Sequence, residues 1–171
     1  NKSCMDLGDK INEYITDLDG FKNKRKEYHS DLKIAKIIRD DDVDSFVDFV
    51  SHTNLDLNSK IPKSFFEINT DLQFMCSSLI EYSAVFQSIQ IFKYLFNHIQ
   101  RLPDNIFLAA VLGGNADIIH IIESRGLQPK SFELFRSILA HQINLFDYFV
   151  SNYSLELQID FVNDSIRSFN Y

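Results

Sequence analysis

The 171-residue chain has few of the residues that mark several protein classes, with no tryptophan, three prolines, five glycines and two cysteines. Cys4 and Cys76 can form at most one disulfide and belong to no CxxC pair, so we expect two reduced thiols in an intracellular protein. The longest apolar run, residues 106–112, spans seven residues. A bilayer requires about 20, and we therefore expect no membrane-spanning segment. Charged residues interrupt the first 20 positions, which indicates no secretory signal and favours the cytoplasm, with the nucleus as the alternative.

Positive charge is also in short supply. The chain carries 17 basic against 24 acidic side chains, which gives a net charge of −7 and a pI near 5.1. Because broad binding to a phosphate backbone needs an excess of lysine and arginine, we expect no nucleic-acid partner. The hydrophobic content of 45% suffices for one folded domain that buries roughly 70% of its extended-chain surface.

A repeat of 27 residues is the strongest pattern in the sequence. With Asp44, Gln90, Asp117 and Asn144 as anchors, spaced 46, 27 and 27 residues apart, the surrounding segments align without gaps. Five alignment columns are apolar in all four copies, whereas this composition gives roughly one such column by chance, and we expect these columns to form the core. Relative to the anchor they stand at −10 (Ile34, Ile80, Phe107, Leu134), −6 (Ile38, Ala84, Val111, Ile138), −1 (Val43, Ile89, Ala116, Ile143), +2 (Phe46, Phe92, Ile119, Phe146) and +5 (Phe49, Leu95, Ile122, Phe149).

The spacing within each copy predicts two helices joined by a short turn. The first two columns lie four residues apart and the last two lie three apart, which is the periodicity of an amphipathic helix and not of a strand. Three copies carry a residue that can cap the N-terminus of the second helix, namely Asp42, Ser88 and Asn115. The fourth copy has Gln142 at this position, which is a weaker cap.

These copies resemble the ankyrin repeat. In that family the first helix reads Leu-His-x-Ala-Ala, the turn reads Gly-[His/Asn]-x-Glu and the second helix reads Val-Val-x-Leu-Leu. The third copy is the most similar, with Phe-Leu-Ala-Ala-Val at 107–111, Gly-Asn-Ala-Asp at 114–117 and Ile-Ile-His-Ile-Ile at 118–122. Residues 80–95 follow the same pattern. The chain is similar to the diverged, short-period ankyrin proteins found as large expanded sets in some unicellular eukaryotes, and the resemblance covers about residues 32–157.

The resemblance implies an all-α fold, an α-solenoid of stacked helix–turn–helix (ankyrin-like) repeats with reduced β-hairpin fingers. The fingers are expected to be reduced because the period is six residues shorter than the 33 of ankyrin repeats. The Thr-Pro that opens the usual repeat is absent, and about 58–77 is an insertion that contains Pro62. The expected units are an N-terminal capping helix within 1–31, repeats at about 32–57, 78–104, 105–131 and 132–158, and a half-repeat at 159–171. The capping helix carries Ile11, Tyr14, Ile15, Leu18 and Phe21 on one face.

No segment of the sequence predicts catalysis. Gly113-Gly114 matches no phosphate-binding loop, and the five histidines show no zinc-ligand spacing. Residues 40–44 lack the glycine and the glutamate of a calcium loop. Residues 22–26 hold four basic side chains, which we interpret as a solvated helix face, with nuclear import or an acidic partner as the alternative. We expect no enzyme activity, no cofactor and no metal site.

A stack of helix pairs presents a long surface suited to recognition, so we expect a noncatalytic protein–protein interaction module, a scaffold or adaptor, with a protein partner. The ankyrin resemblance implies a binding groove made by variable first-helix positions, which are Lys36, Tyr82, Ala109 and Arg136 here. Lys36, Tyr82 and Arg136 are the candidate contacts. Phe65 and Phe66 of the insertion are either a plug over a repeat junction or an exposed anchor for a partner. The alternative function is a regulatory or inhibitory subunit that blocks a partner enzyme through the insertion.

Overall fold

The regular secondary structure in the described part of the chain is helical, apart from one isolated bridge. The computed structural model describes residues 17–64, 66–69, 71–72 and 77–153. The only β-type pairing within these residues is an isolated bridge between Lys60 and Ser78, so the predicted all-α class is confirmed for them. The helices described are α2 (Leu18–Lys26), α3 (Lys33–Arg39), α4 (Val43–Thr53), α6 (Leu79–Val85), α7 (Ile89–His98), α8 (Ile106–Gly113), α9 (Ala116–Glu123), α10 (Ser131–Leu139) and α11 (Ile143–Asn152).

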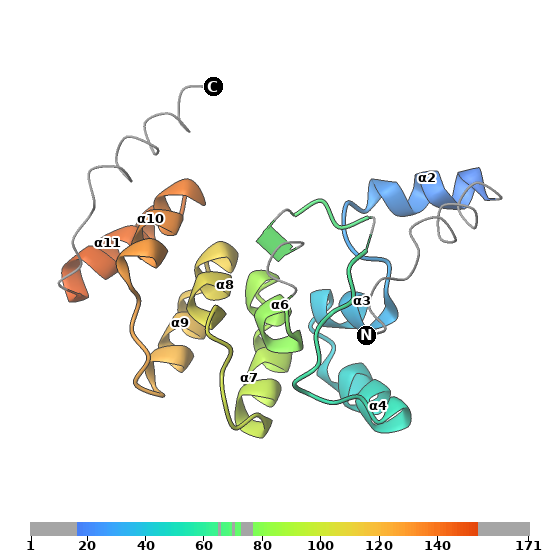
Figure 1. The fold of residues 1–171 in the computed structure, drawn as a ribbon, viewed down its shortest axis with the longest axis horizontal. Helices are drawn as coiled ribbons and strands as arrows, with labels where there is room; N and C mark the ends of the chain where they lie inside the picture. The colour runs from blue at the N-terminus through green and yellow to red at the C-terminus, as the bar shows by residue number, and fades with distance from the viewer. Residues whose placement is uncertain (1–16, 65, 70, 73–76, 154–171) are drawn as a thin grey trace.

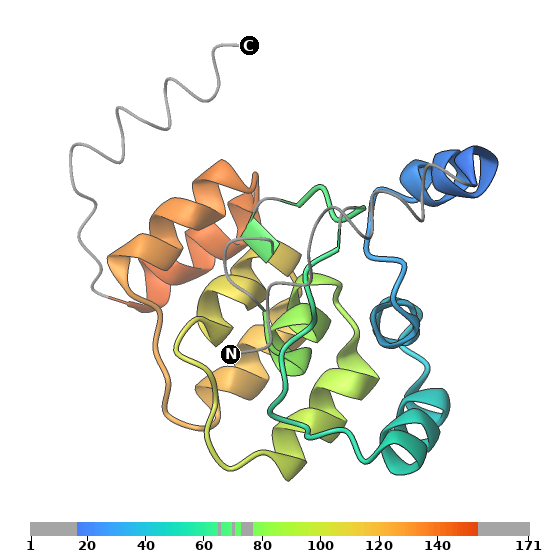
Figure 2. The ribbon, with the colours of Figure 1, turned by 45° about the vertical axis from the view of Figure 1, so that its right-hand side comes forward.

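Eight of these helices form four consecutive pairs, α3–α4, α6–α7, α8–α9 and α10–α11. The first helices, α3, α6, α8 and α10, pack against one another in chain order, and we call them the first-helix row. The second helices, α4, α7, α9 and α11, form the second-helix row, in which α7 packs between α4 and α9. Figures 1 and 2 show the four pairs following one another from α3 at one end to α11 at the other.

The turn inside each pair has the same backbone geometry. Asp41, Gln87, Gly114 and His141 all adopt a left-handed conformation, with φ of 51°, 59°, 78° and 57°. Each of them stands three residues before its anchor, so the sequence repeat is matched by a repeat in the backbone. Glycine occupies this position only in the third pair, where it adopts the left-handed conformation without a Cβ clash.

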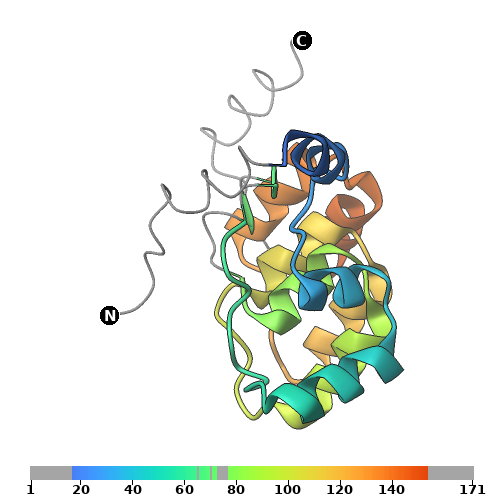
Figure 3. The same ribbon diagram turned by 90° about the vertical axis from the view of Figure 1, so that its right-hand side faces the viewer.

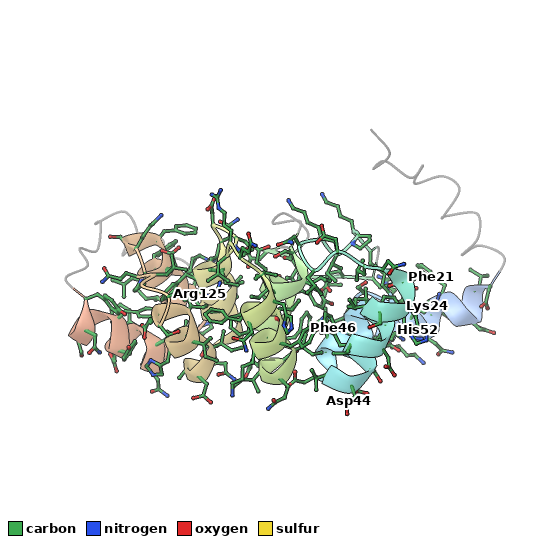
Figure 4. The ribbon with its side chains drawn as sticks, turned by 90° about the horizontal axis from the view of Figure 1, so that it is seen from below. Phe21, Lys24, Asp44, Phe46, His52 and Arg125 are labelled. Atoms are coloured by element: carbon green, nitrogen blue, oxygen red, sulfur yellow. The ribbon has the colours of Figure 1, made fainter. Side chains whose placement is uncertain are left out.

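Four of the five predicted columns lie in the core or at its edge. Every residue at −10, −6, +2 and +5 is buried except Phe49, Ile138 and Phe146, which are half-buried. Phe46, for example, is fully buried and contacts Tyr94 of α7 with ring centroids 5.8 Å apart, whereas Asp44 lies at the outer edge of α4 (Figure 4).

The prediction for the column at −1 holds in two copies, where Val43 and Ile89 are half-buried and pack against the core, and fails in the other two. Ala116 is exposed and Ile143 is 68% exposed. Residues of this column are the first residues of the second helices, at the point where the chain leaves the turn. The residues at +1 are buried in three copies instead, namely Ile91, Ile118 and Leu145.

The caps of the second helices agree with the sequence in two of the three predicted copies. The side chain of Asp42 accepts from Ser45 N (3.0 Å), and that of Asn115 accepts from Asp117 N (3.0 Å). Ser88 stands at the cap position of α7, but its side chain makes no capping hydrogen bond. The carboxylate of Asp41, in the preceding pair, accepts from Gln90 N and Ile91 N at 3.0 Å and takes its place. Gln142 makes no side-chain capping bond either.

Two further polar contacts join consecutive pairs. Arg125, which follows α9 (Figure 4), donates to the carbonyl oxygens of Phe96 and Ile99 at the end of α7. Its guanidinium lies 4.0 Å from the centroid of the Phe96 ring. Glu123 of α9 accepts from the hydroxyls of Tyr148 (2.9 Å) and Tyr153 (2.6 Å). With Asp41, these groups satisfy helix ends and buried polar atoms across the junctions between pairs.

The predicted capping role stays a prediction, because the structure describes only two of the five face residues, Leu18 and Phe21, both in α2. This helix buries none of its residues and Leu18 is 59% exposed. In Figures 1 and 2, α2 lies beyond α3, at the end of the first-helix row. Phe21 of α2 contacts Phe66 of the insertion, with ring centroids 5.5 Å apart. Ile11, Tyr14, Ile15 and the expected half-repeat at 159–171 lie outside the described residues.

Candidate functional site

The described part of the insertion, residues 58–64, 66–69, 71–72 and 77, follows the first-helix row. Its side chains contact the linker between α2 and α3 at one end, where Ser64 Oγ lies 3.4 Å from Asp31 Oδ1. They reach α6 through Glu67 and Tyr82, and they reach α10 through Asp71 and Arg136. Figure 3 shows this segment, in green, along the side of the stack formed by α6, α8 and α10. The insertion therefore lies on the face where the sequence predicts the binding groove.

Glu67 is the centre of a buried polar cluster at one end of this segment. The Glu67 side chain is only 6% exposed, yet each of its oxygens has partners. Oε2 accepts from Ser30 N and from the hydroxyl of Tyr82, both at 3.3 Å. Oε1 lies 3.2 Å from His29 Nδ1 and accepts from Asn69 N at 3.2 Å. A buried carboxylate is stable only when hydrogen bonds and cations replace its hydration, and these partners do so.

Arg39 of α3 completes the cluster. Its Nη1 donates to Tyr82 Oη (3.0 Å) and to the carbonyl oxygen of Ser30 (2.9 Å). Burial raises the pKa of Tyr82 and Glu67 raises it further, while Arg39 acts in the opposite direction. The phenol therefore stays protonated at neutral pH. It accepts a hydrogen bond from Arg39 and donates one to Glu67, so each bond polarises and strengthens the other.

The other end of the segment is held by one ion pair. Arg136 Nη2 lies 2.5 Å from Asp71 Oδ2, and the two side chains are 21% and 36% exposed. The Arg136 Nε is buried and has no hydrogen-bond partner among the described residues. Asp71 thus engages one of the guanidinium nitrogens and leaves the paired donor geometry of arginine unused.

A small cavity of ≈20 Å³ lies between the insertion and α6. Its lining includes Ile61, Pro62, Glu67, Ser77 and Tyr82. The volume corresponds to about one water molecule, and Ser77 Oγ is buried without a partner among the described residues. The packing of the insertion on α6 is therefore incomplete.

The predicted groove residues do not form one exposed surface. Tyr82 is 1% exposed and Ala109 is fully buried, because the insertion and the neighbouring helices cover this part of the first-helix row. Lys36 is half-buried and pairs with Glu27 at 3.2 Å, and Arg136 pairs with Asp71. The prediction of an exposed groove along these four positions is therefore corrected. Lys36 and Arg136 are partly accessible, whereas Tyr82 and Ala109 are buried. Whether Lys36 and Arg136 bind a partner stays a prediction.

The sequence allows two interpretations of the aromatic pair in the insertion, a plug over a repeat junction or an exposed anchor for a partner. Phe66 is 2% exposed, so it is not an exposed anchor; the ring it packs against is Phe21 of α2, and a plug over a repeat junction stays a prediction. Phe65 lies outside the described residues. Glu67, His29 and Arg39, which the sequence did not single out, are the residues that hold the insertion, and no spacing rule connects them because they come from three separate segments.

The described residues contain no group of three or more metal-ligating side chains. Within the same residues, no helix has the length and apolar content to cross a bilayer. Comparison of the chain with protein-family models, with curated proteins and with solved structures gave no match.

Proposed function

We propose that the protein is a noncatalytic protein-interaction module built as an ankyrin-like α-solenoid. The observation that carries the proposal is the shared turn. In all four pairs a left-handed residue stands where the ankyrin turn has glycine. The ordered rows of first and second helices give further support. In such an array each pair is stabilised by its neighbours, and the extended surface serves recognition.

The binding face in this proposal is the first-helix row together with the insertion that lies on it. Lys36 and Arg136 mark its two ends, and their side chains are 43% and 21% exposed. Arginine is among the residues that most often dominate the free energy of protein–protein binding, particularly when it is partly desolvated. The alternative, an inhibitor that inserts residues 58–77 into an enzyme, has less support because Phe66 and Glu67 are buried against this chain.

The proposal is tested by capture of partner proteins on the immobilised full chain. The test variant combines Lys36→Glu with Arg136→Glu, and the matched control is Lys93→Glu, an exposed lysine of α7 in the second-helix row. We expect the double variant to lose the captured proteins and the control to retain them, with far-UV circular dichroism unchanged in both. Equal capture by wild type, double variant and control would contradict the assignment of the face, and equal loss in the control would do the same.

A further inference from the structure

We infer that the first-helix row binds an extended acidic peptide of a partner protein, and that the carboxylates of Glu67 and Asp71 occupy the place of that peptide in the free protein. The inference rests on the proposed function and adds the chemistry of the partner. It is carried by the distribution of charge over the two helix rows, by the donors that surround Glu67, and by the incomplete use of Arg136.

Charge is distributed unequally over the two rows. The first-helix row carries four cationic side chains, Lys33, Lys36, Arg39 and Arg136, against two carboxylates, Glu81 and Glu133. Both carboxylates accept hydrogen bonds from the starts of their own helices, Glu81 from Ser78 N and Glu133 from Lys130 N. The second-helix row has one lysine and five carboxylates. Lys33 Nζ lies 5.7 Å from the centroid of the Phe49 ring of α4, and Lys36 pairs with Glu27. In a chain of net charge −7, Arg39 and Arg136 beside the insertion are therefore the positions of this row that attract an acidic ligand.

The donors at one end of the row converge on a carboxylate position. Ser30 N and the Tyr82 hydroxyl both donate to one oxygen of Glu67, and His29 Nδ1 lies beside the other. Arg39 polarises the Tyr82 hydroxyl at 3.0 Å. A main-chain N–H, a phenol and an imidazole arranged around one point form a receptor for a carboxylate whichever chain supplies it.

Arg136 provides the second carboxylate position at the other end. Its buried Nε has no partner among the described residues while Nη2 is bound to Asp71. An arginine binds a carboxylate most strongly through two parallel N–H···O bonds. A partner carboxylate that approaches Nε and Nη2 together would make a better pair than Asp71 makes here.

The separation of the two positions defines the ligand. Glu67 and Asp71 are four residues apart, which allows a reach of at most about 14 Å. The partner peptide is therefore expected to carry two acidic residues at a similar separation, in an extended or loosely turned conformation. Phe66, just before Glu67, is buried against α2, so an aromatic residue before the first acid would add apolar contact.

An internal ligand lowers the apparent affinity for an external one. The peptide can bind only to molecules in which Glu67 and Asp71 have left these two positions. The apparent dissociation constant is therefore the intrinsic one divided by the fraction of molecules in that state. Weakening the internal contacts should therefore strengthen binding of the external peptide. A receptor without an internal ligand would lose affinity or remain unchanged when these carboxylates are altered.

The probe is a fluorescein-labelled synthetic peptide with the sequence of residues 64–72, and the measurement is fluorescence anisotropy with the full chain. Asp71→Asn should lower the dissociation constant about two- to five-fold, because it removes one partly exposed ion pair. Glu67→Gln combined with Asp71→Asn should lower it at least tenfold. Asp147→Asn, which removes an exposed carboxylate of α11, is the control and should leave it unchanged.

Three further results complete the test. Adding Arg136→Gln to Asp71→Asn should abolish the gain, and a peptide with Gln and Asn in place of its Glu and Asp should not bind. Circular dichroism identifies any variant that does not fold, and Asp71→Asn alone keeps the test valid because its side chain is partly exposed. The inference is overturned if the peptide binds no variant, or if Asp71→Asn and Asp147→Asn behave alike. If that happens while partner capture still depends on Lys36 and Arg136, the proposed function stands and only the partner chemistry fails.

Discussion

Replacing Gly113 with alanine tests how closely the first helices approach one another. Gly113 ends α8 and is buried against α6. A Cβ at this position would lie 2.1 Å from the carbonyl oxygen of Ala84 and 3.1 Å from that of Val85. An ordinary contact begins near 3.4 Å, so α6 and α8 would have to separate by roughly 1 Å to admit one methyl group. Both obstructing atoms belong to the backbone, and no side-chain rotation can relieve the clash.

Two effects of opposite sign determine how much Gly113→Ala changes the free energy of unfolding. Alanine is favoured over glycine in a helix by up to about 1 kcal/mol. Overpacking of a tight core costs about 1–3 kcal/mol, and the cost is larger when backbones must move. The interface that opens includes Ile80, Ala84 and Ala110, all of which are almost fully buried. We therefore expect Gly113→Ala to lower the free energy of unfolding by about 2 kcal/mol, or Tm by about 4–8 °C in a chain of this size.

The assay is urea unfolding followed by circular dichroism and by tyrosine fluorescence, with thermal unfolding as a second measure. Gly126→Ala is the control, because nothing lies within 4 Å of its Cβ position and only its φ of +77° opposes a side chain. That variant should lose about 1 kcal/mol. Gly113→Ser and Gly113→Val should lose progressively more than Gly113→Ala. A Gly113→Ala protein as stable as wild type, or more stable, would refute the close packing of α6 on α8.

Two other perturbations address the contacts between pairs. Asp41→Ala removes the carboxylate that caps α7 and should cost about 1 kcal/mol in urea unfolding beyond the cost of alanine at a left-handed position. The control is Gln87→Ala, an exposed residue at the equivalent left-handed position of the next pair, which carries only the second cost; equal losses would contradict the cap. For Glu123, burial acts to raise the pKa, but hydrogen bonds from Tyr153, His120 and Tyr148 outweigh it and hold the pKa below its usual value of 4.5. A lowered folded-state pKa stabilises the protein above the unfolded-state pKa, and this contribution is lost as the pH falls through the folded-state value. The stability difference between wild type and Glu123→Gln should therefore be larger near pH 7 than near pH 3, measured by urea unfolding at both values; a difference that grows at low pH would contradict this sign.

The helix pairs could be predicted from the sequence because their signal is local. Apolar residues three and four apart define each helix face, and the turn residues that separate the helices recur at the same offset from the anchor. At −1 the local signal holds for Val43 and Ile89, which pack against the core, but not for Ala116 and Ile143, which are exposed at the starts of α9 and α11. The same local signal correctly predicts Ser88 as the N-cap residue of α7. The side chain that accepts from the first N–H groups of this helix, however, is that of Asp41, 49 positions before Gln90.

The path of the insertion could not be predicted, because distant residues determine it. The contact between Glu67 and His29 joins residues 38 positions apart, and that between Asp71 and Arg136 joins residues 65 positions apart. No periodicity encodes such pairs, and a single sequence gives no information on which charges meet. The buried position of Tyr82 follows from the same contacts, so the predicted groove had the correct helices but the wrong exposure at its centre.

Paramagnetic NMR on the full chain tests most directly whether the insertion lies on the first-helix row. A nitroxide is attached at Ile68→Cys, with Cys4 and Cys76 replaced by serine. The Ile68 side chain is 61% exposed and its backbone N–H donates to the carbonyl oxygen of Tyr28 at 3.2 Å. We predict strong broadening of the amide signals of residues 28–31 and of Tyr82 in the first-helix row, whose hydroxyl donates to Glu67, and none for Asp117 and Asp147 in the second-helix row. Unbroadened signals at residues 28–31, or equal broadening in both rows, would contradict the placement of Glu67 and the account of the binding face built on it.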